Sequence, residues 1–160
     1  MSTTQGLAFH VHHMKLVEWC YNLDERVQYI RDCKPAEEVP TRLRLLAMVK
    51  GPLSPALQKA LERGNAMRVK GNAMRDKGHA MWVKGSAMRV KGYAMLAKGQ
   101  VMWAKGQAMW REGLDMRYKG YAMIDAAIAA HMPELERLHA LECRACPWDG
   151  TAIFPRGGTR

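Results

Sequence analysis

The stretch KGSAMRVKGYAMLAKGQVMWAKGQAMW, residues 84–110, places a glycine at every seventh position among good helix formers. It belongs to nine tandem copies of Gly-x-Ala-Met-x-x-Lys that run from residue 64 to residue 126. Seven residues make two turns of an α-helix, so each repeated residue type forms a stripe along one side. Neither β-solenoid periods nor the three-residue period of collagen fits this spacing. The repeat therefore predicts a long helix.

Two columns of the repeat are complete, because glycine fills the first position and methionine the fourth position of all nine copies. On a helical wheel these columns are neighbours and form one apolar face, while alanine and the sixth-position residues form a second one. The second, fifth and sixth positions of the heptads vary, which indicates either a recognition surface or an exposed face whose residues change without functional constraint. The candidate interface residues are Gly71, Met74, Gly78, Met81, Gly85, Met88, Gly92, Met95, Gly99 and Met102.

The glycine column carries an energetic cost that needs an explanation. Nine glycines inside a helix cost about 1 kcal/mol each relative to alanine, a sum comparable with the stability of a whole domain. Burial of a methionine side chain contributes about 1.5 to 3 kcal/mol, which offsets this loss if another helix covers the stripe. Glycine lets a second backbone come close, and methionine fills irregular gaps. The glycines therefore predict sites of helix–helix contact.

The length of the repeat helix suggests where its partner comes from. Ser54 and Pro55 are typical of a helix start, and no stop signal follows before Pro133. A helix over 54–132 would be about 115 Å long, far longer than any other helix that the sequence predicts. We therefore expect a homo-oligomer that self-associates through this rod. The alternative to a homo-oligomer is an internal hairpin, although no heptad marks a break in the helix. A further alternative is that the repeat is a low-complexity sequence without a selected function.

The flanking segments predict a small cap around the rod. Apolar residues at helical spacing indicate a helix over 14–33 and a shorter one within 41–49. Alternation within residues 9–12 indicates a short strand that could pair with residues 151–154. The expected fold class is all-α: a coiled-coil-like rod with a helical cap and a minor two-stranded pairing. The expected domains are 1–53, 54–132 and 133–160. The face of the first helix would carry Leu16, Cys20, Leu23, Val27 and Ile30.

The segment HALECRACPWDG, residues 139–150, has the spacing His-x3-Cys-x2-Cys. Two thiolates at this spacing can reach one Zn²⁺, and a histidine one helical turn earlier can join them. The fourth ligand would come from the segment FHVHH, residues 9–13. The candidate zinc ligands are His139, Cys143, Cys146, His10 and His12, with His13 as a further possibility.

Two alternatives to the zinc site remain open. Cys143 and Cys146 could be buried apolar thiols, with no metal bound. A redox pair is disfavoured because the Cys-x2-Cys spacing lacks a βαβ context. Pro147 stands where many zinc knuckles place glycine, which also counts against the metal. The expected cofactor is therefore zinc or none.

Charge is concentrated in the repeat. The chain carries a net charge of +10, and residues 64–126 contribute +8 of it. Such a tract attracts nucleic acid, acidic proteins or anionic lipid. The lysine column has a simpler interpretation, since its aliphatic stems can cover apolar surface while the amines reach water.

The sequence also bears on location. It has no apolar run of about 18 residues and no secretory leader, so we expect a cytoplasmic protein without a membrane span. Four cysteines in such a protein are expected to be reduced thiols or metal ligands.

The whole layout resembles a group of uncharacterised bacterial and phage-associated proteins. The shared features are a His-rich start, DERVQYIRDCKP at 24–35, RLRL at 42–45, the short repeats, CPWDG at 146–150 and IFP at 153–155. This resemblance implies that the two ends of the chain form one unit, and it implies no activity. No catalytic constellation is present in the sequence, so we expect no enzyme. The expected function is a structural or interaction protein, with binding of nucleic acid or another polyanion as the alternative.

Overall fold

The computed structural model describes residues 5–90 and 93–154, and within them the chain is mostly helical. Contacts divide the chain into two units. The first unit, here called the head, combines residues 1–54 with residues 128–160. The second unit, here called the hairpin, spans residues 55–127.

A small antiparallel sheet lies in the head, so the expectation of an all-α fold was wrong for this part. Its strands are β1 (Gly6–Phe9), β2 (Val17–Cys20) and β3 (Ala47–Met48), in the order β2-β1-β3. Leu7 pairs with Trp19, and Phe9 pairs with Ala47. The predicted strand partner at 151–154 does not join this sheet. It contributes one backbone hydrogen bond, from Ile153 N–H to the His13 carbonyl at 2.9 Å.

Only the C-terminal part of the helix expected over 14–33 is helical, and a strand lies in its N-terminal part. Residues 17–20 form β2, and α1 covers only Leu23–Cys33. The side chain of Asn22 explains the boundary, because it accepts hydrogen bonds from the backbone N–H groups of Asp24 and Glu25 and caps the helix. The apolar residues of 16–20 fit a helical wheel and a strand equally well, and sheet pairing decided between them.

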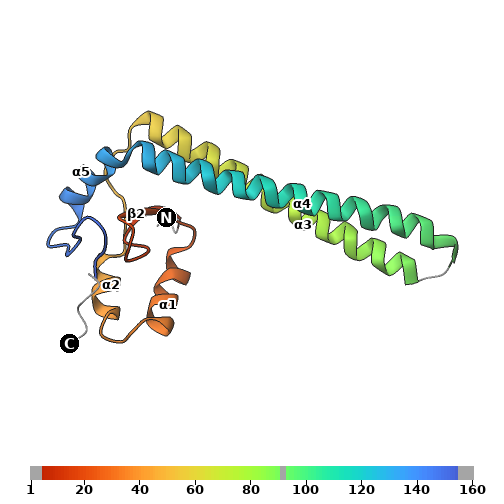
Figure 1. Ribbon diagram of the computed structural model, residues 1–160, viewed down its shortest axis with the longest axis horizontal. Coiled ribbons are helices and arrows are strands. Elements are labelled where there is room, and N and C mark those ends of the chain that lie inside the picture. Colours follow the sequence, from red (N-terminus) through yellow and green to blue (C-terminus); the bar gives the residue numbers. More distant parts are fainter. Residues whose placement is uncertain (1–4, 91–92, 155–160) are drawn as a thin grey trace. The chain divides into compact units, whose positions relative to one another are not determined.

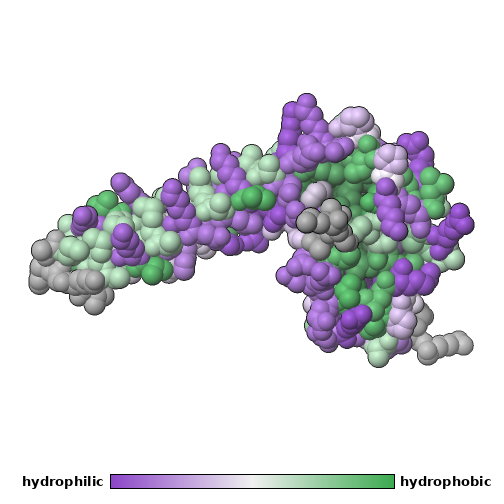
Figure 2. All heavy atoms as spheres, turned by 180° about the vertical axis from the view of Figure 1, so that it is seen from behind, coloured by the Kyte–Doolittle hydropathy of each residue, from purple (hydrophilic) through white to green (hydrophobic). Residues whose placement is uncertain are grey.

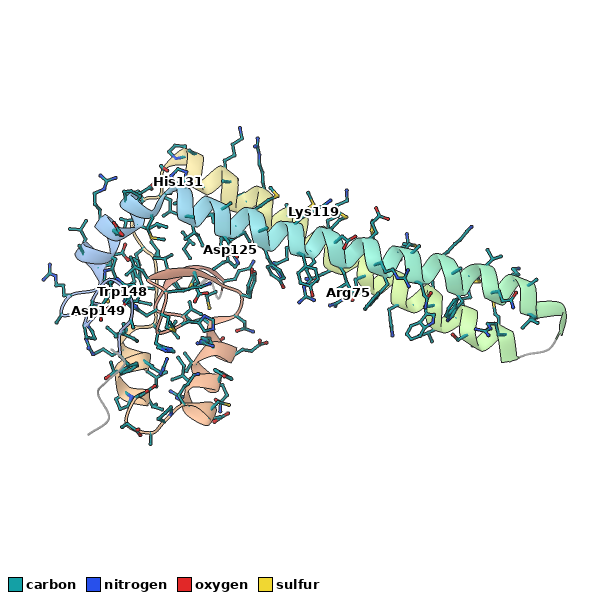
Figure 3. The ribbon with its side chains drawn as sticks, in the orientation of Figure 1. Arg75, Lys119, Asp125, His131, Trp148 and Asp149 are labelled. Carbon is teal, nitrogen blue, oxygen red and sulfur yellow. The ribbon has the colours of Figure 1, made fainter. Side chains whose placement is uncertain are left out.

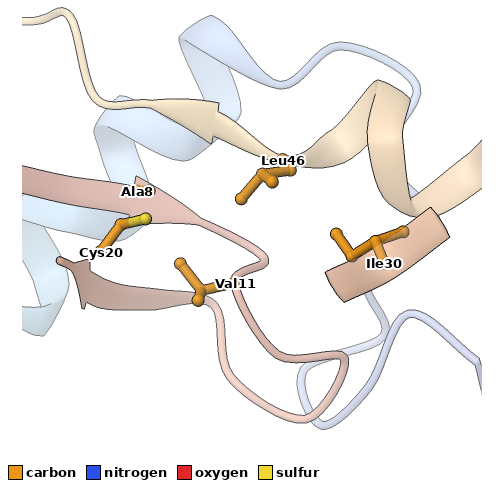
Figure 4. Packing of buried hydrophobic residues seen from close by; sticks show 5 residues of the cluster. All are labelled: Ala8, Val11, Cys20, Ile30 and Leu46. Atoms are coloured by element: carbon orange, nitrogen blue, oxygen red, sulfur yellow. The ribbon is translucent and has the colours of Figure 1, made fainter. Parts of the chain in front are cut away.

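A cluster of buried apolar side chains joins the sheet to α1 and to the segment after α2 (Val39–Leu45). Pro40 lies in the first turn of α2, where proline is tolerated, so it opens the helix instead of breaking the chain. Leu43 is partly buried, whereas Leu45 is almost completely buried. Figure 4 shows the members of the cluster, which are Ala8, Val11, Cys20, Ile30 and Leu46.

Helix α5 (Met132–Glu142) brings the C-terminal segment into the head, with Pro133 in its first turn. Two of its carboxylates hold the segment that precedes the hairpin. Glu134 accepts hydrogen bonds from the N–H and hydroxyl groups of Ser54, at 2.5 and 2.7 Å. Glu142 accepts from the N–H groups of Lys50 and Gly51, at 2.9 and 2.7 Å. Residues distant in the sequence are thereby joined.

The hairpin consists of α3 (Pro55–Val90) and α4 (Tyr93–Ala130), which run side by side in Figure 1. The predicted helix start at Pro55 is confirmed. The prediction of one continuous helix over 54–132 was wrong, because α3 and α4 are two helices that pack together. The internal hairpin, which the sequence left as the alternative, is the observed arrangement.

Glycines form the seam between these two helices. A Cβ atom added to Gly78 would lie 2.7 Å from the Gly106 carbonyl oxygen, and one added to Gly106 would lie 2.7 Å from the Gly78 oxygen. Both positions therefore require glycine for a close approach of backbones. The same reciprocal contact recurs along the hairpin, in the layers Gly64–Gly120, Gly71–Gly113, Gly78–Gly106 and Gly85–Gly99.

The expected role of glycine in helix contact thus agrees with the structure, but the expected source of the partner does not. Chain reversal supplies a second helix of similar length from the same molecule, with 38 residues against 36, and both helices carry glycine at the same interval. No helix of the head is long enough to cover the repeat, but the second half of the repeat covers the first. Within the described ranges, 5–90 and 93–154, no helix is long and apolar enough to span a membrane.

Candidate metal centre and hairpin surfaces

Four side chains of the head converge on one point. The Nε2 atoms of His10 and His139 lie 3.0 Å apart, and the Cys146 sulfur lies 3.1 Å from His10 Nε2. With Cys143 included, the possible ligand atoms all lie within 4.8 Å of one another. Ligands around a tetrahedral Zn²⁺ ion are about 3.3 to 3.8 Å apart, as Zn–N and Zn–S distances of about 2.1 and 2.3 Å require. The cluster could therefore hold a metal ion after small adjustments.

His10 reaches the cluster from the end of β1. Its backbone leaves the extended conformation with φ of 53°, and its N–H donates to the Leu16 carbonyl at 3.0 Å. The imidazole is 2% exposed. This turn also explains why His12 does not share the position of His10, as it would on a regular strand. His12 is exposed and instead pairs with Glu18.

The other three residues come from the end of α5. His139 lies in its last turn, and Cys143 follows the helix with its N–H bonded to the His139 carbonyl at 2.8 Å. Ala145 has φ of 55°, a left-handed conformation that turns the chain between the two cysteines. This turn brings Cys146 back toward Cys143. The local spacing seen in the sequence thus has a direct structural basis.

The segment after Cys146 is fixed to the head by a second turn. The carboxylate of Asp149 accepts hydrogen bonds from the N–H groups of Thr151 and Ala152, each at 2.8 Å. Phe154 then lies under the guanidinium of Arg42, 4.9 Å from the ring centre. Trp148 and Asp149 are labelled in this segment in Figure 3. These contacts hold Cys146 in place from its C-terminal side.

The electrostatic environment favours neutral imidazoles. Burial lowers the pKa of His10 to about 4, with a smaller contribution from the nearby His139. Burial also lowers the pKa of His139. Both rings are therefore uncharged at neutral pH, which is the form that binds a metal.

Cys143 is in the opposite situation, because its surroundings favour the protonated thiol and not the thiolate that binds a metal. Burial raises the pKa of Cys143 to about 11, assisted by its hydrogen bond with Cys146. Without a metal this thiol keeps its proton, and a bound metal would displace it.

Aromatic rings surround the cluster. The ring centres of Phe9 and His139 are 5.3 Å apart, and those of His10 and Trp148 are 5.7 Å apart. In the part of the chain that the structure describes, Nδ1 of His10 has no hydrogen-bond partner. Neither aromatic neighbour was included in the sequence prediction; the available signal was that Phe9 directly precedes His10 and that Trp148 lies two residues after Cys146.

The remaining cysteines and His13 lie outside the cluster. Cys20 belongs to the buried apolar core, where burial raises its pKa, and Cys33 is exposed. His13 contributes its carbonyl to the hydrogen bond with Ile153. None of the three is among the residues that could share the ion.

The predicted interface residues divide into two groups in the hairpin. The described glycines among them are buried against the partner helix of the same chain. The methionines are half-buried or, at Met95, 37% exposed. Gly92 lies outside the described residues. The alanine column was expected to form part of a second apolar face, and those of its residues whose burial the structure describes are exposed.

Comparison with known proteins adds no relative. No protein-family profile matches the chain, no curated protein is significantly similar in sequence, and no solved structure matches its fold.

Proposed function

We propose that this is a structural, interaction protein with a zinc-clasped head and a glycine-seamed hairpin that binds another macromolecule. The observation that carries the proposal is the convergence of four ligand atoms within 4.8 Å. The residues involved are two histidines and two cysteines, which is the ligand set of many structural zinc sites.

The ligand count favours a structural ion over a catalytic one. A catalytic Zn²⁺ has three protein ligands and keeps one position for water or substrate. Here His10, His139, Cys143 and Cys146 would fill all four positions. Sulfur and imidazole ligands in this combination favour zinc over magnesium or calcium, which prefer oxygen. The ion would therefore stabilise the head and would not activate a substrate.

The ion would connect distant parts of the chain. His10 and His139 are 129 residues apart in sequence. Binding of a structural zinc contributes on the order of 10 kcal/mol at neutral pH, which is comparable with the net stability of a whole domain. Folding of the head would then depend on the metal.

Metal content of the purified protein tests this proposal. Under reducing conditions and without an affinity tag, we expect one zinc ion per chain by elemental analysis. His10→Ala should lower the content well below one, whereas the matched variant His12→Ala should keep it. A wild-type content near zero would refute the zinc clasp, and equal losses in the two variants would refute the assignment of His10.

Self-association is a second candidate role for the hairpin. The glycine seam is already covered within the chain, so a second copy would need the outer surfaces. Val69, Val83 and Val101 support this candidate, because they are 52%, 51% and 55% exposed. Figure 2 shows apolar side chains interleaved with polar ones along the hairpin. A molecular mass by light scattering that stays monomeric at all concentrations would exclude it.

A further inference from the structure

The hairpin has two chemically different faces. Each residue of a helix is rotated by about 100° from the previous one. The second and fifth heptad positions therefore lie to one side of the glycine column, and the methionine column lies to its other side. Because α3 and α4 are antiparallel and meet at their glycines, equivalent heptad positions of the two helices lie on the same face of the pair. One face therefore combines the second and fifth positions of α3 and α4, and the opposite face combines their methionine and lysine columns.

The first of these faces, here called the Arg/Trp face, comprises the second and fifth positions of the four glycine-paired layers. Its sixteen positions contain four arginines, three tryptophans and no acidic residue. The four acidic residues of the repeat all lie at other heptad positions, and one of them, Asp76, forms an ion pair with Arg75 at 2.8 Å. Most remaining positions carry planar polar side chains or tyrosine. The cationic and aromatic members of the Arg/Trp face are Arg68, Arg75, Arg89, Arg117, Trp82, Trp103, Trp110 and Tyr121.

Neighbouring side chains hold several of these groups in defined positions. The guanidinium of Arg89 lies 5.7 Å from the ring centre of Trp103. The guanidinium of Arg117 lies 5.4 Å from the Tyr121 ring centre, and its Nε donates to the Tyr121 hydroxyl at 3.0 Å. Arg–aromatic pairs of this kind present charge beside a flat surface, which suits a ligand that is both anionic and aromatic.

A cavity lies on this face at the Gly78–Gly106 layer. It is lined by His79 and Trp82 from α3 and by Gln107 and Trp110 from α4, with a volume of about 230 Å³. Pockets for drug-sized ligands are typically about 300 to 1,000 Å³, so this cavity suits a single planar ring system. Its two tryptophans are 39% and 40% exposed and are therefore accessible. His79 and Gln107 add polar groups at its edge.

We propose that the Arg/Trp face binds single-stranded nucleic acid, with a base stacked in the tryptophan cavity and phosphates on the arginines of neighbouring layers. Bases of a single strand are free to stack on aromatic side chains, whereas those of a duplex are already stacked. The four layers cover about 30 Å of helix, enough for several nucleotides. Figure 3 shows the side chains that project from α3 and α4, among them Arg75. This inference rests on the proposed binding role of the hairpin and not on the zinc clasp.

Affinity of the purified full-length protein for a labelled 20-nucleotide oligo(dT) strand tests the stacking part. Loss of a base–aromatic stack costs about 1 to 3 kcal/mol, so Trp82→Ala with Trp110→Ala should weaken binding about 5- to 150-fold. Replacement of both tryptophans by phenylalanine should retain most of the affinity. Val101→Ala is the control, because Val101 occupies a third heptad position outside the face and is 55% exposed. Unchanged binding by the double alanine variant would overturn the proposal.

A matched pair of charge variants tests the location of the phosphates. Arg89→Gln with Arg117→Gln removes two charges from the Arg/Trp face, and Lys84→Gln with Lys119→Gln removes two from the opposite face. Each phosphate contact contributes about −0.7 to the slope of log affinity against log salt concentration for a single strand. The arginine variant should therefore make the slope less negative by about 1.4, and the lysine variant should leave it nearly unchanged. Equal changes in both variants would overturn the proposal.

Competition by inorganic polyphosphate and by a 20-base-pair duplex completes the test. Both should compete at least tenfold less well than the unlabelled strand. Competition by polyphosphate at equal phosphate concentration would mean binding by charge alone and would overturn the inference. A protein with one zinc ion per chain that fails to bind the strand would also overturn it, while leaving the zinc clasp intact.

Discussion

The head is held together by side chains that each occur once, whereas the hairpin is held together by one contact that recurs in every layer. In the head, two histidines and two cysteines from opposite ends of the sequence meet at one point. In the hairpin, pairs of glycines bring two backbones together at four successive layers. The chemistry of the first unit is therefore concentrated in a few residues, and that of the second is distributed.

This difference determines how each unit should respond to damage. Loss of one ligand would remove much of the energy that a bound metal would contribute to the head. Loss of one glycine contact disturbs one layer of the hairpin, while the other layers keep the same geometry. A single substitution of a ligand should thus destabilise the head more than a single substitution of a glycine destabilises the hairpin.

Removal of the metal should give the largest effect. A chelator, or Cys143→Ser with Cys146→Ser, should cost the head on the order of 10 kcal/mol and unfold it. Hydrogen exchange measured by mass spectrometry reports the two units separately. Amides of β1 and β2 should lose protection, whereas amides of α3 and α4 should keep it. Protection retained in the strands, or lost equally in both units, would contradict the comparison.

Substitution of a seam glycine should give the next largest effect, with a sign opposite to helix propensity. In an isolated helix, glycine to alanine is favourable by about 1 kcal/mol. In Gly106→Ala the new Cβ would lie 2.4 Å from the Trp82 backbone nitrogen, so the helices must separate. We expect a destabilisation of about 1 to 3 kcal/mol, measured by thermal unfolding.

Two further variants sharpen the glycine test. Gln100→Ala changes an exposed residue of the same helix and should shift stability by less than about 0.5 kcal/mol. Gly71→Ala should destabilise by a similar amount to Gly106→Ala, because its Cβ would lie 2.5 Å from the Arg117 nitrogen. A stabilised Gly106→Ala variant would show that the seam is not as close as described.

The smallest effect concerns Glu134, whose carboxylate accepts from the Ser54 backbone N–H and hydroxyl. These bonds lower its pKa below the ordinary value of 4.5, the backbone bond most strongly. A carboxyl group with a lowered pKa stabilises the fold above its ordinary pKa, and this contribution is lost as the pH falls below it. Glu134→Gln should therefore cost about 1 kcal/mol at pH 7 and progressively less below pH 4.5.

The matched control for Glu134 is Glu136→Gln, since Glu136 lies exposed on the same helix. It should shift stability by less than about 0.5 kcal/mol at any pH. Denaturant unfolding at pH 7 and at pH 3.5 would compare the two variants. A Glu134→Gln cost that is equal at both pH values would exclude a charge-dependent role.

Local sequence was most informative where the structure depends on local spacing. The seven-residue interval predicts helices and helix contact at glycine, and both agree with the structure. The spacing of His139, Cys143 and Cys146 placed three of the four clustered residues together, because a helix end and a tight turn are both local features. The start of α3 at Pro55 also follows from residues adjacent to it.

The sequence was least informative where distant segments compete. Residues 17–20 became a strand because β1 was available for pairing, which no local pattern reveals. His10 and not His12 joined the cluster because the chain turns at His10, with φ of 53°. The rod was predicted to need a second molecule because nine nearly identical heptads contain no signal for chain reversal.

By itself the sequence determined that the repeat is helical, that glycine is its contact residue and that a histidine and two cysteines lie close together. Only the tertiary structure decided that the second helix comes from the same chain, and that the fourth residue of the cluster is His10. The physical reason is that periodicity specifies which side of a helix a residue occupies. It does not specify what covers that side, because this depends on contacts between residues far apart in the chain.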